Sequence, residues 1–361
     1  MPDDDYMKRS LQLARRGLGK TSPNPMVGAV IVKGDHIIGE GYYRHFRGKH
    51  AEVNAIENAE VDIGGATMYV TLEPCCHHGQ TPPCTDAIIA GKIGKVVIGM
   101  LDPDKRVSGR SVEILREHGI ECTVGMFEDE CRSLNETYIK HRSTGLPFVT
   151  VKFAQTLDGR IASSTGHSRW ISSPASRKLG HRLRTRHDAV LVGIGTVVKD
   201  NPQLTIRLVR GRNPLRVVLD SSLRIASDAT VLTEQEKAKT LIAATTGAPK
   251  EKPAAYKNMG IEVLTVPADA HGDVDLRQLL KTLGERNVSS ILVEGGAETI
   301  TSFLRLGLAD RLVIFTAPRI MGRGVEAVGE LEIKDVAGAL KLTFEKVYRS
   351  AEDVVIEARV G

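Results

Sequence analysis

The segments HAEVNAIEN at residues 50–58 and LEPCCHHGQTPPCTDAI at residues 72–88 decide the fold of the first half of the chain. They offer one imidazole, two thiols and a neighbouring carboxylate. These groups belong to His50, Cys75, Cys84 and Glu52. Zinc with three protein ligands keeps a fourth position for water, whereas a structural zinc site is normally closed by four ligands. The pattern therefore predicts a catalytic zinc site.

Glu52 is the predicted catalytic residue, and it is not expected to be a ligand. Zinc lowers the pKa of its bound water to about 7, and a carboxylate in the first turn after the His ligand can move that water's proton. The alternative is a structural zinc or three unrelated core residues, which would leave Glu52 without a role. The nearby His77 and His78 are expected at exposed loop positions. The other cysteines are predicted to be ordinary thiols: Cys76, Cys122 and Cys131.

Around this motif the apolar residues alternate between helical and strand-like spacing. In chain order we expect a helix over 5–17, a hairpin around 33–35, a helix over 50–58, a strand over 66–74, a helix after residue 84 and a strand over 95–100. Such alternation is typical of an α/β layered sheet. The first half is therefore predicted to be a layered α/β/α domain.

A domain boundary is predicted where the helical pattern stops at TGLP, residues 144–147, and the strand FVTVKFA begins. The chain has 361 residues, more than one hydrophobic core usually organises, so we expect domains over 1–146 and 147–361. The second is also predicted to be α/β. Its expected strands lie in 148–154, 189–195, 215–221, 240–246, 261–266, 290–296 and 311–318, with a helix over 275–286 and a mobile surface connection over 243–258.

The composition is that of an ordinary globular protein, with 41% hydrophobic and 26% charged residues. The net charge is +5 and the sequence pI is about 8.9, but the basic residues are scattered along the chain. Aromatic residues make up 4%, which leaves little material for stacking nucleic-acid bases. The mildly basic charge suits a phosphorylated small molecule as well as it suits a nucleic acid, and the low aromatic content weakly disfavours a nucleic-acid partner.

The amino-terminal segment MPDDDYMKRS is acidic and has no apolar core followed by a cleavage site. No segment approaches the roughly 20 apolar residues that span a bilayer. We therefore expect a cytoplasmic protein with no membrane partner, in which the five cysteines are thiols or metal ligands. A homo-oligomer is the expected assembly.

The motifs H-x-E and P-C…C resemble those of the zinc deaminases of the cytidine deaminase superfamily. In this chain eight residues separate Cys75 from Cys84. That longer spacing and the segment TSPNPMVGAV at 21–30 are similar to the pyrimidine deaminases of riboflavin biosynthesis. The resemblance implies that Asn24 binds the pyrimidine. The chain departs from the family pattern at Cys76, where a Ser is expected, and at Gln80, where a basic residue is common.

The second half lacks the G-x-G-x-x-G fingerprint of a dinucleotide-binding domain. It carries, in order, VKFAQTLDGRIA at 151–162, GHSRWISS at 166–173, VGIGTVVKDNPQLTIR at 192–207, VVLDSSLRI at 217–225 and LVEGGAETITSFL at 292–304. This ordered set resembles the reductase domain of riboflavin biosynthesis, which implies a dihydrofolate-reductase-like α/β fold that uses NADPH/NADP+.

The resemblance also implies two sets of contacts in this half. The residues that contact the cofactor are Ala154, Trp170, Thr196, Asp200, Ser221, Gly296, Ala297, Glu298, Thr299, Ile300, Thr301 and Ser302. The residues that contact the substrate are Ser168, Arg184, Leu204, Arg207 and Glu294, with the two arginines suited to a phosphate. A helix that begins at Gly296 can hold a pyrophosphate, and Gly193 and Gly195 allow close approach of the backbone. The alternative is an ordinary turn at Gly296, with Trp170 in the core.

The two resemblances together imply a bifunctional enzyme of riboflavin biosynthesis. The first domain would deaminate a phosphorylated diaminopyrimidine with zinc, and the second would reduce its ribosyl group to ribityl with hydride from NADPH. Lys152 and Asp200 are expected polar supports near the sugar. Two alternatives remain: a nucleic-acid or nucleoside deaminase with a recognition domain, and a zinc-stabilised binding module joined to a ligand sensor. A free Glu52 argues against the binding module, since a structural zinc has no use for it.

Overall fold

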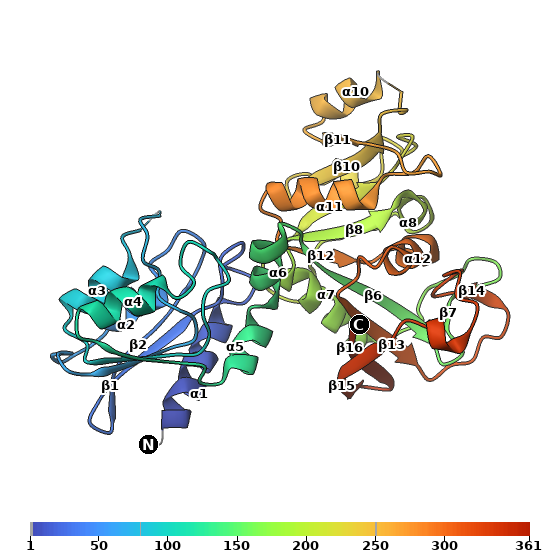
Figure 1. The fold of residues 1–361 in the computed structure, drawn as a ribbon. Coiled ribbons are helices and arrows are strands. Elements are labelled where there is room, and N and C mark those ends of the chain that lie inside the picture. Colours follow the sequence, from blue (N-terminus) through green and yellow to red (C-terminus); the bar gives the residue numbers. More distant parts are fainter. Residues whose placement is uncertain (1–2, 80, 250) are drawn as a thin grey trace. The chain divides into compact units, whose positions relative to one another are not determined.

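The computed structural model describes residues 3–79, 81–249 and 251–361 (Figure 1). It divides into two compact units, Met1–Gly145 and Leu146–Gly361. The division falls after Gly145, whereas the sequence places it after residue 146. Gly145 has a φ of 73° and ends the last helix of the first unit, a conformation that glycine adopts without steric cost.

The first unit is built on a five-stranded sheet of order β2-β1-β3-β4-β5. β1 is antiparallel to both neighbours, and β3, β4 and β5 run parallel. The strands are β1 Gly28–Lys33, β2 His36–Tyr42, β3 Thr67–Val70, β4 Lys95–Ile98 and β5 Glu121–Val124. The helices are α1 Asp3–Ala14, the 3-10 turn η1 Arg15–Gly17, α2 Ala51–Glu57, α3 Cys84–Ala90, α4 Arg110–Glu117, α5 Glu128–Leu134 and α6 Glu136–Thr144.

Both faces of this sheet are covered by helices. Successive side chains of a strand point to opposite faces, and β1 follows that rule with every residue but its last buried. Ala29 and Ile31 pack with residues of α2, α3 and α4, while Val30 and Val32 pack against α1. The expected α/β/α layering is therefore confirmed, and α1 lies on the other face from α2 and α3 (Figure 1).

The second unit is built on a nine-stranded sheet of order β11-β10-β9-β8-β12-β6-β13-β16-β15. The seven strands from β11 through β13 in this order are parallel to one another. β16 pairs antiparallel with β13, and β15 pairs antiparallel with β16. The strands are β6 Phe148–Thr156, β8 Ala189–Gly193, β9 Leu215–Leu219, β10 Thr240–Thr245, β11 Glu262–Val266, β12 Ser290–Val293, β13 Arg311–Ala317, β15 Leu342–Ser350 and β16 Asp353–Val360; β7 Arg160–Ser163 pairs with β14 Gly324–Glu326.

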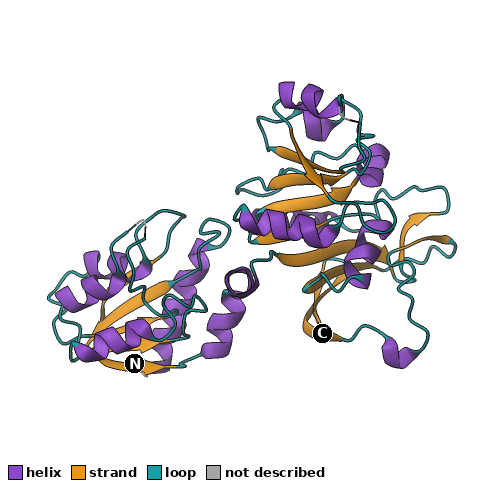
Figure 2. Ribbon diagram, turned by 45° about the horizontal axis from the view of Figure 1, so that its top comes forward, coloured by secondary structure: helices purple, strands orange, loops and turns teal. Residues whose placement is uncertain are grey.

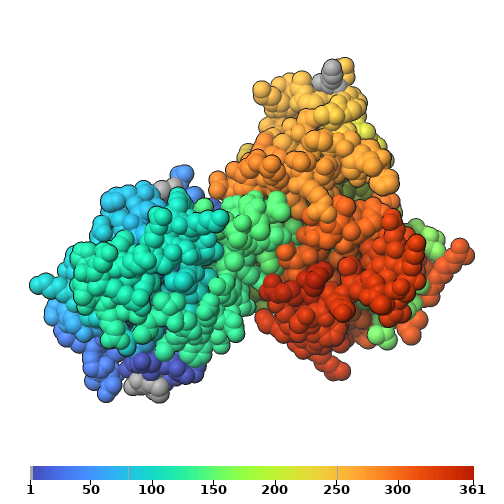
Figure 3. All heavy atoms as spheres, in the orientation of Figure 1, coloured from blue at the N-terminus to red at the C-terminus, as the bar shows by residue number. Residues whose placement is uncertain are grey.

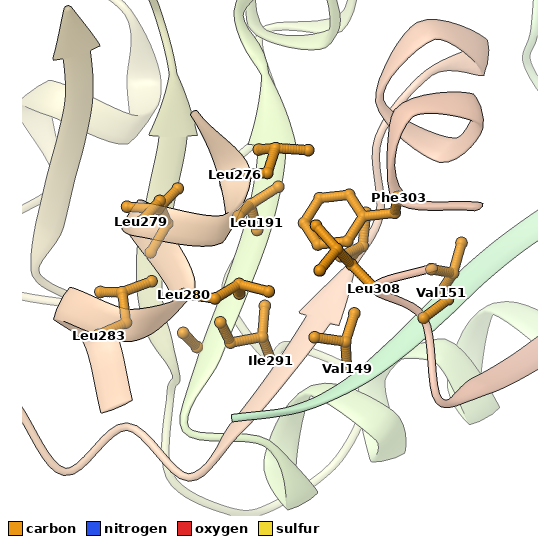
Figure 4. Packing of buried hydrophobic residues seen from close by; sticks show 14 of the residues in the cluster. Val149, Val151, Leu191, Leu276, Leu279, Leu280, Leu283, Ile291, Phe303 and Leu308 are labelled. Carbon is orange, nitrogen blue, oxygen red and sulfur yellow. The ribbon is translucent and has the colours of Figure 1, made fainter. Parts of the chain in front are cut away.

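Helices cover the second sheet on both faces as well (Figure 2). They are α7 Pro174–Arg186, α8 Ile194–Asp200, α9 Thr230–Thr233, α10 Lys252–Asn258, α11 Leu276–Glu285, α12 Ala297–Arg305 and the 3-10 turn η2 Val336–Gly338. Leu191 of β8 faces the cluster formed with α11 and α12 (Figure 4), whereas its neighbours Val190 and Val192 face α8, α9 and α10. The second α/β prediction is confirmed.

Three details differ from the sequence-based expectations. β3 ends at Val70, so Cys75 lies in a loop and not at the end of a strand. The segment 243–258, in which residue 250 lies outside the described residues, contains the buried end of β10 and the helix α10. Figure 3 shows α10 at the surface. Tyr256 of α10 is buried and donates a hydrogen bond to the Ile225 carbonyl at 3.0 Å. The carboxyl-terminal hairpin β15–β16 was not predicted, because most of β15 is exposed and lacks the pattern of a buried strand.

No helix among the described residues is long and apolar enough to cross a membrane.

Glycines let the helix that follows His50 lie directly on the sheet. A Cβ added at Gly41 of β2 would lie 2.2 Å from the Ala51 carbonyl oxygen and 2.3 Å from the Ala55 nitrogen. These are backbone atoms of α2, so no side-chain rotation can make room. The absence of a side chain at Gly41 therefore fixes the height of α2 above β2, and with it the position of His50.

We predict that Gly41→Ala displaces α2 and destabilises the first unit by about 2–3 kcal/mol, the usual cost of overpacking. Hydrogen exchange of the β1 and β2 amides in the full chain measures this loss. The matched control is Gly79→Ala, because a Cβ added at Gly79 meets open space. Unchanged protection in Gly41→Ala would contradict the packing of α2 described above.

Candidate zinc centre and cofactor site

Two helix starts and one loop bring the three predicted zinc ligands together. His50 is the residue before α2, Cys84 is the first residue of α3, and Cys75 lies in the loop after β3. The Nδ1 atom of His50 lies 3.2 Å from the Cys84 sulfur and 3.4 Å from the Cys75 sulfur. All three ligand atoms lie within 4.8 Å of one another. Ligand atoms around a tetrahedral zinc are about 3.5–3.8 Å apart, so the arrangement fits zinc.

The electrostatics of the two thiols also call for a cation. The Cys84 side chain donates a hydrogen bond that lowers the pKa of Cys75 to about 4, and His50 adds to this effect. The Cys84 backbone N–H also donates to the Cys75 sulfur at 3.3 Å. The same pairing, together with burial, raises the pKa of Cys84. A second thiolate at Cys84 therefore needs a positive ion between the two sulfurs.

Glu52 lies beside this cluster without belonging to it. Its side chain is in the first turn of α2, and the residue is only 3% exposed. Burial raises the pKa of Glu52 to about 7, against the opposing effect of the nearby His50. A carboxyl group with a pKa near 7 can accept and donate a proton at neutral pH. The geometry thus separates a proton-transfer group from three metal-binding groups.

A cavity of about 380 Å³ opens at these residues, a size that suits a small ligand. Asn24 lines it and donates a hydrogen bond from Nδ2 to the Tyr43 hydroxyl at 2.9 Å. The Tyr43 ring meets the His50 ring edge-on, with centroids 5.4 Å apart. Asn24 therefore lies in the same cavity as the zinc ligands.

A buried carboxylate holds the loop that follows β4 against this cavity. Glu73 accepts hydrogen bonds from the backbone N–H groups of Asp102, Gly109 and Ser111 at 3.0–3.2 Å. Asp102 in turn accepts a bond from the Tyr138 hydroxyl at 2.9 Å, and burial raises the pKa of Asp102 to about 6. The loop thus presents a buried, polar wall to the ligand.

Several lining residues were missed from the sequence: Tyr43, Glu73, Asp102, Asp104, Arg106, Tyr138 and Arg142. A signal existed for Asp102, since it follows β4, the parallel neighbour of β3, and ligands bind at the carboxyl ends of such strands. The expectation for His77 was wrong: it lines the cavity, and its Nδ1 is buried without a partner among the described residues. His78 is exposed, as expected. Gln80 lies outside the described residues.

In the second unit, the predicted contacts gather at the carboxyl ends of neighbouring parallel strands. Ala154 is near the carboxyl end of β6, and Thr196 is in the first turn of α8, directly after β8. Ser221 follows β9, and Gly296 follows β12. These four strands are adjacent in the sheet in the order β9-β8-β12-β6. The carboxyl edge of a parallel sheet is where α/β proteins bind ligands.

The helices α8 and α12 begin next to each other at this edge. A Cβ added at Gly296 would lie 3.7 Å from the Thr196 hydroxyl, an ordinary contact, whereas at Gly193 it would lie 2.6 Å from the Thr299 hydroxyl. At Gly295 it would lie 2.5 Å from the Thr299 Cβ, and at Gly195 it meets open space. Glycine is therefore required by packing at 193 and 295 but not at 195. The two free helix starts fit a pyrophosphate.

Arg184 and Glu294, two of the expected substrate contacts, are brought together by the fold. Arg184 forms a two-fold ion pair with Glu294 at 2.6 and 3.0 Å and donates to the Thr205 carbonyl at 2.8 Å. Burial alone would raise the pKa of Glu294, but the charges of Arg184 and Lys152 outweigh it and lower that pKa to about 2. Burial also lowers the pKa of Lys152. Arg184 thus holds Glu294 in place in the ligand-free protein, and both partners are largely buried.

The remaining predicted contacts differ in accessibility. Trp170 is 60% exposed, so it is not a core residue, and the Arg177 guanidinium lies 4.4 Å from the centre of its ring. Arg207 is exposed and Ser168 is half-buried. Leu204 is buried in the core below α8, so only its backbone is available to a ligand. The Asp200 carbonyl accepts a bond from Arg169 at 2.6 Å, and Ser221 donates to Asp273 at 2.9 Å.

The predicted cofactor segment of α12 is divided between the helix start and the following turn. Gly296, Ala297, Glu298 and Thr299 lie at the start of the helix. Ile300 is buried in the core, and its N–H donates to the Gly296 carbonyl at 3.1 Å. The hydroxyls of Thr301 and Ser302 bond back to carbonyls one turn earlier. In the ligand-free protein these later residues therefore support the helix.

Two family models match the chain, one in each unit. The cytidine and deoxycytidylate deaminase zinc-binding region matches residues 1–100, and the RibD C-terminal domain matches residues 147–356. These matches confirm the cytidine-deaminase-like fold of the first unit and the reductase fold of the second.

Relatives and solved structures match over nearly the whole length. The riboflavin biosynthesis protein RibD of Aquifex aeolicus (strain VF5) is 46% identical over 355 residues, which cover 98% of this chain and 97% of the relative. That of Escherichia coli (strain K12) is 36% identical over 370 residues, with 99% of each covered. A diaminohydroxyphosphoribosylaminopyrimidine deaminase/5-amino-6-(5-phosphoribosylamino)uracil reductase from Thermotoga maritima is 40% identical, with a TM-score of 0.86 over 99% of this chain and 98% of that one.

Acinetobacter baumannii RibD is 34% identical, with a TM-score of 0.90 over 99% of both chains. A zinc-binding deaminase region and a reductase domain thus follow one another in a single chain, in the same order and over the same length as in these relatives. The chain belongs to the RibD family of riboflavin biosynthesis proteins.

Proposed function

We propose that this chain catalyses two successive steps of riboflavin biosynthesis. The first unit deaminates 2,5-diamino-6-(5-phosphoribosylamino)pyrimidin-4-one to 5-amino-6-(5-phosphoribosylamino)uracil and releases ammonia. The second unit then reduces the ribosyl group to ribityl with NADPH. The observation that carries the proposal is that Glu52 lines one cavity with His50 and Cys75, next to a cluster of three side chains that can hold zinc. The activity named for the Thermotoga maritima relative supports it.

In the deaminase, Glu52 transfers the protons. A Zn²⁺ ion held by His50, Cys75 and Cys84 would supply an activated water next to the amino-bearing ring carbon. Glu52 would carry one proton of this water to the ring nitrogen as the water oxygen adds to the carbon. It would then carry the second proton, from the added hydroxyl, to the amine as the carbon–nitrogen bond breaks and ammonia leaves. Its raised pKa suits both directions of transfer at neutral pH. Asn24 orients the pyrimidine through its amide.

In the reductase, the chain's own residues orient the sugar and exclude water. NADPH would supply a hydride to the sugar C1′. The starts of α8 and α12, at Thr196 and Gly296, hold the cofactor pyrophosphate, and Trp170 and Ser221 flank it. Glu294 lies beside the sugar, and the charge of Lys152 helps to lower the pKa of this carboxyl. Arg184 keeps Glu294 ionised and in place. Arg184 and the exposed Arg207 are the arginines available to the substrate.

The units 1–146 and 147–361 are proposed to carry the deaminase and the reductase, respectively. A cytoplasmic location accords with five cysteines that are all free thiols. We also propose that the protein is a homo-oligomer. We propose that it binds no nucleic acid, since its substrate is a small phosphorylated pyrimidine. The direct test incubates the zinc-loaded protein with the diaminopyrimidine substrate and follows ammonia release and then NADPH oxidation.

Glu52→Gln is expected to abolish ammonia release while zinc content stays the same, because the carboxylate moves protons and does not bind the metal. Metal analysis and an ammonia assay on one preparation measure both. The reduction of supplied 5-amino-6-(5-phosphoribosylamino)uracil serves as the control and is expected to continue. Turnover at the wild-type rate in this variant would refute the role of Glu52.

Cys75→Ser and Cys84→Ser are each expected to lose zinc and deaminase activity, because a hydroxyl does not replace a thiolate ligand. The reductase is expected to keep its activity, since each unit has its own hydrophobic core. Zinc analysis and NADPH oxidation on the purified variants test this. Cys122→Ser is the control, as Cys122 lies on β5 away from the ligands. Joint loss of both activities would contradict independent units.

Gly296→Val is expected to raise the dissociation constant of NADPH at least tenfold, because a bulky side chain obstructs the start of α12. The fold should tolerate the change, since a Cβ at Gly296 makes only an ordinary contact. Calorimetry measures binding, and ammonia release should be unaffected. The control is Gly338→Val, where an added Cβ also meets only contacts of 3.5 Å or more. Equal NADPH affinity in both variants would remove this cofactor site.

A further inference from the structure

The deaminase cavity is lined by a second charged cluster that the zinc chemistry does not use. It consists of Asp104 and Arg106, in the loop after β4, and Arg142, near the end of α6. Asp102 lies two positions before Asp104, and Tyr138 lies four positions before Arg142. The Tyr138 hydroxyl donates a hydrogen bond to Asp102. That bond joins the loop to α6, so the cluster is held at one place in the cavity wall.

Within this cluster, Arg106 already has a partner. It forms a two-fold ion pair with Asp104, with Nη2 to Oδ2 at 2.6 Å and Nε to Oδ1 at 3.0 Å. The hydrogen bond from Arg106 lowers the pKa of Asp104 to about 2. The Arg106 side chain is 61% exposed and that of Asp104 is 11% exposed. Arg106 can therefore reach into the cavity while Asp104 stays fixed.

Arg142 is available to a ligand. Its guanidinium lies 5.7 Å from the centre of the Tyr138 ring and is exposed. Across the described ranges, no carboxylate lies within ion-pair distance of it. Arg142 and Arg106 line the same cavity, and the charges of both lower the pKa of the Asp104 carboxyl. Two guanidinium groups in one cavity suit an anion with more than one oxygen, because guanidinium groups bind phosphate through paired hydrogen bonds.

We propose that Arg142 and Arg106 bind the phosphate of the deaminase substrate, and that Asp104 competes with this phosphate for Arg106. The inference rests on the proposed deaminase function, whose substrate carries one phosphate. The Asp104 carboxylate occupies Arg106 in the free protein and releases it when phosphate enters. Asp104 therefore weakens phosphate binding, whereas Arg106 and Arg142 strengthen it.

Another arginine, Arg47, also lines the cavity. It is on the loop before His50, and its guanidinium lies 5.3 Å from the centre of the Phe46 ring. It is distant in sequence from the Asp104 cluster, and its charge is not among those that lower the pKa of Asp104. Arg47 is therefore the alternative phosphate ligand that an experiment must separate.

The test measures the KM for ammonia release with the phosphorylated substrate and with the same substrate after removal of its phosphate. We expect Arg142→Met to raise the first KM about tenfold or more, the usual effect of losing a hydrogen bond to a charged group, and to leave the second unchanged. Asp104→Asn should lower the first KM about threefold, because Asn keeps an oxygen acceptor but no charge. The control is Arg132→Met, since Arg132 pairs with Glu128 on α5 outside the cavity.

Ribose 5-phosphate is the second probe, because its calorimetric binding requires no turnover. It should bind more weakly to Arg142→Met and more tightly to Asp104→Asn than to the wild type. This measurement tests the phosphate site even if the wild type releases no ammonia, a result that would refute the proposed function alone. The inference is overturned if Arg142→Met changes both KM values equally or neither, if Asp104→Asn weakens ribose 5-phosphate binding, or if Arg47→Met alone reproduces the expected loss.

Discussion

Two thiols and an imidazole held between the starts of α2 and α3 impose the main constraint on the first unit. Cys75 and Cys84 are close enough to share a hydrogen bond, so the second thiolate forms only with a cation between them. The rest of the unit keeps this arrangement in place. Gly41 lets α2 lie against β2, and Glu73 holds the loop that closes the cavity. The packing of α2 on β2 therefore also sets the position of the metal-binding side chain of His50.

The second unit solves a comparable problem without a metal. Parallel strands end at one edge of the sheet, and the helices that follow them begin there with unpaired N–H groups. The helices α8 and α12, which follow β8 and β12, begin so close together that Gly193 and Gly295 have no room for a side chain beside Thr299. At the same edge Glu294 is kept ionised, because the charge of its partner Arg184 outweighs the effect of burial on its pKa. The edge therefore combines helix starts, which suit an anion, with a largely buried carboxylate.

The sequence predicts those features that depend on local spacing. His50, Cys75 and Cys84 lie in short motifs, and the alternating apolar runs give the elements of the first unit as far as β4 and the seven parallel strands of the second. Features that depend on distant pairing could not be read in this way. Glu294 and Arg184 are 110 residues apart, so the ion pair between them has no local signal. The exposed strand β15 lacks the burial pattern that identifies the other strands.

The proposed reaction sequence adds a requirement that neither unit meets alone. The product of the deaminase keeps its phosphate and becomes the substrate of the reductase, so each unit must recognise the same anion. In the first unit the cavity offers exposed guanidinium groups, and one of them is paired with a carboxylate. In the second unit Arg184 is largely buried and paired with Glu294, whereas Arg207 is exposed. Water and salt weaken the interaction of an exposed guanidinium group with phosphate. Moderate phosphate affinity at the exposed arginines of the first unit would favour release of the intermediate after deamination.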